Sequence, residues 1–149
     1  MLRQKVTTFL WYDTQAEEAA NFYVSLFQNS RVTKVTPGPT GGAFVVEFEL
    51  DGVQFVALNG GPIFKFNEAI SLSVDCADQA EVDDLWEKLS AGGFKSQCGW
   101  LKDKYGLSWQ IVPSVLPKLM ADPSGRVMQA MLQMSKLDIQ KLQDAFDGK

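Results

Sequence analysis

The stretch Ala43–Leu58, AFVVEFELDGVQFVAL, predicts a β-hairpin in the first half of the chain. Up to Leu50, large apolar residues occupy alternate positions, which is the period of a strand with one buried face. Asp51-Gly52 follows, a pair typical of the tight turn between two antiparallel strands. Val53–Leu58 then returns as the second strand of the pair.

Upstream of this hairpin the sequence predicts a strand, a helix and a further strand. Val6–Tyr12 is rich in β-branched and aromatic residues. Asp13-Thr14 offers an N-cap for a helix over Gln15–Phe27, whose apolar residues recur every three or four positions. Arg31–Val35 is the further strand, and Pro37-Gly38-Pro39 ends it. The first half therefore has the order βαβββ.

The second half repeats this order of elements. Ile70–Val74 predicts a strand, and Asp78–Ala91 predicts an amphipathic helix that Gly92-Gly93 ends. Phe94–Leu101 and Leu107–Val112 are then predicted as strands.

Two short sequence likenesses support an internal duplication. Gln15-Ala16-Glu17 recurs as Gln79-Ala80-Glu81, and Gly52–Val56 matches Gly106–Gln110 with apolar residues at alternate places. We therefore predict an α+β fold whose two βαβββ modules, about residues 1–62 and 63–121, form one domain with a cupped mixed sheet.

Residues 122–149 form a C-terminal helical extension in this interpretation. Pro123-Ser124 starts one helix and Ser135 caps another, and both helices carry stripes of apolar residues. Helices this short are not stable alone. We therefore expect each stripe to pack on the sheet or on a partner chain.

The composition excludes several classes of function. The 149 residues include no histidine, so Ser-His-Asp hydrolysis is excluded, as are the zinc and iron sites that depend on imidazole. The formal net charge is −4, which argues against nucleic acid as the main partner. What remains is chemistry by carboxylate, Lys, Tyr or Cys side chains, or binding without chemistry.

Other features indicate a cytoplasmic protein. We interpret the two cysteines, Cys76 and Cys98, as reduced thiols with no metal to bind. No stretch approaches the roughly 20 apolar residues of a membrane span, and the start, Met1–Lys5, lacks the apolar core of a signal peptide. We expect neither a membrane nor a nucleic acid as a partner.

Strand alternation places a candidate ligand site on the sheet face that the helices leave open. The ligand-binding residues predicted there are three aromatics, two hydroxyls and an amide, namely Phe9, Trp11, Trp100, Ser71, Ser73 and Gln110. Trp100 is included because it falls on the same side of its predicted strand as Ser96 and Cys98. Glu47 is a weak candidate for a catalytic acid.

Each of these positions also has a purely structural interpretation. Phe9 and Trp11 can belong to the core, Gln110 can be a structural amide, and the two serines and Glu47 can simply face water. Lys102-Asp103-Lys104 is expected to be a solvated charge cluster in a hairpin loop.

Several stretches resemble one protein family. They are Phe9–Asp13 (FLWYD), Asn59–Pro62 (NGGP) followed by Phe64–Ser71 (FKFNEAIS), and Cys98–Gln110 (CGWLKDKYGLSWQ). They resemble the PhnB-like branch of the vicinal-oxygen-chelate superfamily, which contains the glyoxalase and bleomycin-resistance proteins. Many members of this branch are named demethylubiquinone methyltransferases. The resemblance extends over nearly the whole chain, including Met128–Leu142, and implies a duplicated βαβββ fold and a homodimer.

The resemblance to the wider superfamily also implies a metal held by His and Glu from four strands. In this chain those positions fall near Thr7, Val56, Ala69 or Ser71, and Gln110, and none of them is His or Glu. We therefore expect no metal and no other cofactor. Nothing in the chain resembles the glycine-rich loop that usually holds a methyl donor.

Two functions remain open from the sequence. The preferred one is a non-metal protein that holds a small, partly apolar molecule in an aromatic-lined pocket, as the resistance proteins of the superfamily do by sequestration. The alternative is an enzyme that acts on such a molecule through Glu47, Tyr12 or a bound cofactor. Its chemistry would be methyl transfer, or a reaction of the glyoxalase or dioxygenase type.

Overall fold

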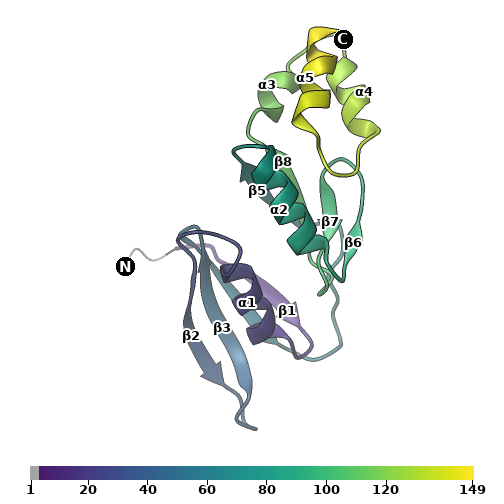
Figure 1. The fold of residues 1–149 in the computed structure, drawn as a ribbon. Helices are drawn as coiled ribbons and strands as arrows, with labels where there is room; N and C mark the ends of the chain where they lie inside the picture. The colour runs from purple at the N-terminus through teal and green to yellow at the C-terminus, as the bar shows by residue number, and fades with distance from the viewer. Residues whose placement is uncertain (1–3) are drawn as a thin grey trace. The chain divides into compact units, whose positions relative to one another are not determined.

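A computed structural model describes residues 4–149, so Met1–Arg3 of the predicted start lie outside the described residues. The chain divides into two compact units, of which unit 1 ends at Phe66 and unit 2 covers Asn67–Lys149. Each unit holds one four-stranded mixed sheet with a helix against it (Figure 1). Among the described residues, no helix has the length and apolar character needed to cross a membrane.

The sheet of unit 1 has the strand order β1-β4-β3-β2, in which β1 is parallel to β4 and the other neighbours are antiparallel. Its strands are β1 (Thr8–Tyr12), β2 (Arg31–Pro37), β3 (Ala43–Leu50) and β4 (Val53–Asn59). Asp51 and Gly52, between β3 and β4, have φ of 48° and 79°. Two successive positive φ values are typical of the type I′ turn, so the predicted hairpin is confirmed.

Helix α1 (Ala16–Val24) is shorter than predicted and is capped differently. Its N-cap residue is Gln15, which makes no side-chain cap, so the predicted cap at Asp13-Thr14 is wrong. The first N–H of the helix, that of Ala16, instead donates to Oδ1 of Asn59 at 2.8 Å. The last residue of β4 therefore supplies the acceptor that a helix start needs.

The core of unit 1 lies between α1 and the sheet. Its large buried side chains include Leu10, Tyr12, Tyr23, Phe48 and Phe55. Burial of one such apolar side chain contributes roughly 1.5–3 kcal/mol to folding.

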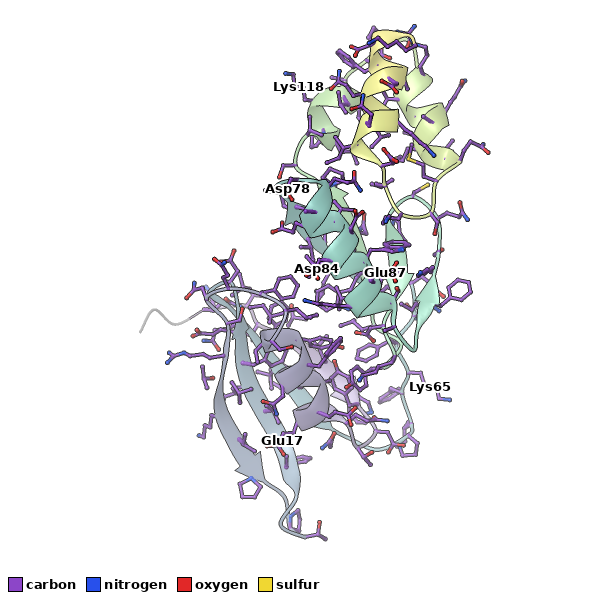
Figure 2. The ribbon with its side chains drawn as sticks, viewed as in Figure 1. Glu17, Lys65, Asp78, Asp84, Glu87 and Lys118 are labelled. Atoms are coloured by element: carbon purple, nitrogen blue, oxygen red, sulfur yellow. The ribbon has the colours of Figure 1, made fainter. Side chains whose placement is uncertain are left out.

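Unit 2 repeats the topology of unit 1, with the strand order β5-β8-β7-β6. Its elements are β5 (Ser71–Cys76), α2 (Gln79–Ser90), β6 (Phe94–Lys95), β7 (Trp100–Lys102) and β8 (Ser108–Pro113). Figure 2 labels Asp78 at the start of α2, where its side chain accepts the N–H of Glu81 at 2.9 Å. Because the order βαβββ and both strand orders recur, the predicted duplication is confirmed.

The single strand predicted over Phe94–Leu101 is wrong, because this segment is a hairpin. β6 and β7 pair antiparallel, and the turn between them holds Cys98 at φ 60° and Gly99 at φ 83°. Ser96 and Cys98 therefore do not share a strand with Trp100, and the argument that placed Trp100 in the site fails. Its position follows instead from its pairing with Gln110.

The C-terminal segment forms three short helices around a small core of its own. They are α3 (Leu116–Met120), which was not predicted, α4 (Arg126–Leu132) and α5 (Ile139–Asp147). α5 is capped by Asp138 and not by Ser135. Their buried residues are Leu119, Val127, Leu137 and Leu142, so much of each apolar stripe is covered within the chain.

Side-chain and backbone hydrogen bonds attach this C-terminal segment to the rest of unit 2. Nε2 of Gln79, on α2, donates to the carbonyl oxygen of Leu137 at 3.1 Å, and its Oε1 accepts the N–H of Ile139 at 2.7 Å. In the turn between β6 and β7, the N–H groups of Cys98 and Gly99 donate to the carbonyl oxygens of Met134 (2.9 Å) and Ser135 (2.8 Å).

Candidate functional site

Each sheet has one face against its helix and a second face, which we call the opposite face. In unit 2 the residues that pair across β5, β8 and β7 point to the same side. Leu72, Leu101 and Trp109 form one such row, apolar and facing α2. The opposite face of unit 2 therefore carries the intervening residues, which are Ser71, Ser73, Trp100, Lys102, Ser108 and Gln110.

Polar groups gather at the centre of this face. Nε2 of Gln110 donates to Oγ of Ser71 at 2.9 Å. Ser108, which pairs with Ser71 on β5 and with Lys102 on β7, is only 1% exposed. Its hydroxyl has no hydrogen-bond partner among the described residues. A buried hydroxyl without a partner is unfavourable, and a ligand at this face would relieve that cost.

An ion pair lies beside these hydroxyls. Nζ of Lys102 contacts Oε1 of Glu68, which comes from the segment just before β5. The hydrogen bond from Lys102 is the main reason that the pKa of Glu68 is lowered from its ordinary value. Trp100 lies half-buried on the same face, next to Gln110.

The opposite face of unit 1 is more apolar. Phe9 pairs with Val56, which also pairs with Glu47, so these three residues share one side of the sheet. Phe9 is 61% exposed, whereas Leu10 and Tyr12 are buried on the side of α1. Phe9 and Trp11 therefore lie on the predicted side of the sheet. Their role as ligand contacts stays a prediction.

Tyr12 does not face this side. Its hydroxyl lies 3.0 Å from the hydroxyl of Tyr23, beneath α1. Tyr12 therefore does not lie on the opposite face of the sheet, whereas half-buried Glu47 does. The role of Glu47 as a catalytic acid stays a prediction.

Trp11 is held by the segment that leaves β4. Its indole N–H donates to the carbonyl oxygen of Gly61 at 2.9 Å, and a Cβ at Gly60 would lie 2.2 Å from its ring. The ring of Phe64 meets it edge-on, with centroids 4.9 Å apart. The Asn-Gly-Gly sequence at Asn59 thus has a structural use, because Asn59 caps α1, Gly60 leaves room for the Trp11 ring and the carbonyl oxygen of Gly61 accepts its N–H.

Sequence reasoning did not select Lys102, Glu68 or Ser108 as site residues. The strand period could have found Lys102, which lies two residues from Trp100 on β7. The prediction of solvated surface at Asp103 is wrong, because its side chain is 2% exposed. Its carboxylate accepts from the indole N–H of Trp109 at 2.9 Å and from the backbone N–H groups of Tyr105 (2.9 Å) and Leu107 (3.1 Å).

The chain contains two units with the element order βαβββ, and their sheets have corresponding strand orders. This arrangement defines the class of the protein as the vicinal-oxygen-chelate fold. Within that class the chain belongs to the PhnB-like family described as 3-demethylubiquinone-9 3-methyltransferase, whose sequence pattern matches residues 4–112. The match ends there, so the resemblance expected over Met128–Leu142 is not part of it.

Solved structures agree with this fold, and the first of them agrees with this family as well. The PhnB protein of Bacillus cereus, provisionally named a 3-demethylubiquinone-9 3-methyltransferase, is 34% identical, with a TM-score of 0.70 over 74% of this chain and 99% of that one. A Pseudomonas aeruginosa protein is 14% identical, with a TM-score of 0.62 over 74% and 98%. The fosfomycin resistance protein FosX of Listeria monocytogenes is also 14% identical, with a TM-score of 0.56 over 79% and 97%. No curated protein matches the chain.

FosX has been crystallised with Mn(II), which raises the question whether this chain could hold a metal. At the positions that the superfamily resemblance implies, Val56 is apolar and the Gln110 amide is bonded to Ser71. Within residues 4–149, no three Cys, Asp or Glu side chains are grouped so that they could hold a metal ion. The residues present do not fit a metal.

Proposed function

We propose that the chain binds a small, partly apolar molecule at the opposite faces of its sheets, without a metal. The observation that carries the proposal is the group on unit 2 in which Trp100 adjoins the bonded pair Gln110 and Ser71, next to the buried, unpartnered hydroxyl of Ser108. Small-molecule sites combine apolar or aromatic surface with a few polar groups that set orientation. Ser73 adds an exposed hydroxyl on unit 2. On unit 1, Phe9 and Trp11 offer a separate aromatic surface, which we propose as a ligand contact in its own right.

Ligand-observed NMR with a library of small aromatic fragments tests this function. Fragments should bind the full chain, and Trp100→Leu should weaken them several-fold. Phe146→Leu, on α5, is the matched control and should leave binding unchanged. Wild-type binding by Trp100→Leu, or no binding by any fragment, would contradict the proposal.

Glu47 favours a second candidate, an enzyme, because its half-buried carboxylate lies on the opposite face of unit 1. The name of the family suggests methyl transfer to a quinol-like substrate. Titration with S-adenosylmethionine tests this alternative, and we expect no binding. Saturable binding, together with methyl transfer that Glu47→Gln abolishes, would establish the enzyme instead.

We also propose that the protein is a cytoplasmic homodimer. The free thiols of Cys76 and Cys98 support a reducing compartment. The exposed aromatic surface at Phe9 supports a second copy of the chain as its cover.

A further inference from the structure

We propose that the ligand of unit 2 carries a carboxylate, which Lys102 and the hydroxyls of Ser71 and Ser108 bind, and that Glu68 competes with this carboxylate for Lys102. The inference rests on the proposed function and specifies its ligand.

The first argument is the row of donors across three neighbouring strands. Ser71 on β5, Ser108 on β8 and Lys102 on β7 are register partners on one face. Ser71 already accepts a hydrogen bond from Gln110, which leaves its hydroxyl hydrogen able to donate to a ligand. The hydroxyl of Ser108 has no partner among the described residues, and Lys102 has only donors. The group that completes this row is therefore an acceptor.

The second argument is charge. The ammonium group of Lys102 makes a negatively charged acceptor the best match, because hydrogen bonds between charged groups are the strong ones. Asp75, a further acid on the same side of β5, lies four residues beyond Ser71, roughly 13 Å along the strand. It is too far away to neutralise the row.

The third argument is that Lys102 already binds a carboxylate of the protein itself. Glu68 pairs with Lys102, yet its side chain is 65% exposed, against 33% for Lys102. An ion pair with such an exposed member contributes little to stability. A ligand carboxylate can therefore displace Glu68, while Trp100 beside Gln110 offers a surface for a flat ring. An aromatic carboxylate fits these features together.

The test compares 4-hydroxybenzoate with its uncharged analogue 4-hydroxybenzamide, titrated calorimetrically into the full chain at pH 7. The acid should bind about tenfold more tightly than the amide, as expected for a charge-assisted contact. Lys102→Met and Lys102→Gln should remove this preference, and Ser108→Ala should weaken acid binding several-fold. Glu68→Gln should strengthen acid binding, because it removes the internal competitor.

The chain offers a matched control in a second ion pair of unit 2. Nζ of Lys95 lies 3.4 Å from Oε1 of Glu87 on α2, which Figure 2 labels. Lys95→Met and Glu87→Gln should change neither affinity.

The outcomes separate this inference from the proposed function. Equal binding of acid and amide, a preference that survives both Lys102 variants, or acid binding unaffected by Ser108→Ala would overturn the carboxylate inference, even if the fragments bind. Failure of every fragment, acidic or neutral, would overturn the proposed function itself.

Discussion

The indole N–H of Trp11 donates to the carbonyl oxygen of Gly61, at 2.9 Å. Gly60, one residue earlier, has no side chain, and this lets the backbone lie against the same ring. The segment that follows β4 is thereby fixed to β1. β1 and β4 also pair with each other in parallel.

The close approach at Gly60 predicts a cost for any side chain there. Gly60→Ala should lower the free energy of unfolding by about 1–3 kcal/mol, because its methyl group must displace the indole ring. Gly42→Ala is the control, since a Cβ at Gly42 meets nothing within 4 Å. Urea denaturation compares the two, and equal midpoints would show that the ring is not held against Gly60.

The buried carboxylate of Asp103 predicts a large effect of its removal. Asp103→Ala should destabilise the protein by at least about 2 kcal/mol, because hydrogen bonds to a charged group contribute about 1.5–3 kcal/mol each. Asp84→Ala, which removes an exposed ion pair with Lys88, should change stability by less than about 1 kcal/mol. Similar thermal shifts for the two variants would contradict a structural role for Asp103.

The regular alternation of β3 and the Asp51-Gly52 turn could be predicted because local residue patterns determine both. The hairpin at Cys98 could not, because a cysteine at positive φ gives no sequence signal of a turn. α3 could not be predicted either, because its first turn contains Pro117, and proline is found both at the ends of elements and in the first turn of a helix.

The candidate site was predictable only in part, for a related reason. The strand period places Ser71 and Gln110 on one face. The burial of Asp103 and the contact of Lys102 with Glu68 depend on residues brought together by folding. Charge alone predicts solvent exposure at Asp103 and at Lys102, whereas Asp103 is buried and Lys102 is half-buried.

The two thiols should react very differently. Burial, and then the nearby charges of Glu81 and Asp75, raise the pKa of the Cys76 thiol from 9.0 to about 12. A disulfide reagent at pH 8 should therefore modify half-buried Cys98 in the native protein and Cys76 only after unfolding. Two outcomes would contradict this: no modification of the native Cys76→Ser variant, which retains only Cys98, or rapid modification of both thiols in the native wild type.

The same raised pKa gives stability a dependence on pH. Between about pH 9 and pH 12 the unfolded chain loses the Cys76 proton while the folded chain keeps it. Ionisation thus favours the unfolded state, so this contribution to stability is present below pH 9 and is lost as the pH rises. The urea midpoint should fall more steeply from pH 8 to pH 10 in the wild type than in Cys76→Ala.

Elemental analysis should find no stoichiometric transition metal in the purified protein. The reason is the set of available donors, since the chain has no imidazole and the implied positions at Val56 and Gln110 hold no carboxylate. About one Zn, Ni, Mn or Fe per chain would contradict the expectation.

Light scattering should give twice the chain mass of 16.5 kDa at micromolar concentration. Phe9→Glu should shift the particle toward the monomer, because it places a charge on the apolar opposite face of unit 1. Leu132→Glu, which changes an exposed residue at the end of α4, should leave the dimer intact. A monomeric wild type, or dissociation by Leu132→Glu alone, would contradict the assignment of the interface.

The C-terminal segment is attached to unit 2 in a way that limits the design of chimeras with shorter relatives. The Bacillus cereus chain is matched over 99% of its length but covers only 74% of this one. Here the turn between β6 and β7 bonds to Met134 and Ser135, and a Cβ at Gly99 would lie 3.0 Å from Leu137. A chimera that carried this turn without residues 134–137 would leave the N–H groups of Cys98 and Gly99 without their acceptors. It would also expose the surface that Leu137 covers. The extension is thus part of the structure of unit 2, and a domain boundary taken from the family match, which ends at residue 112, would remove it.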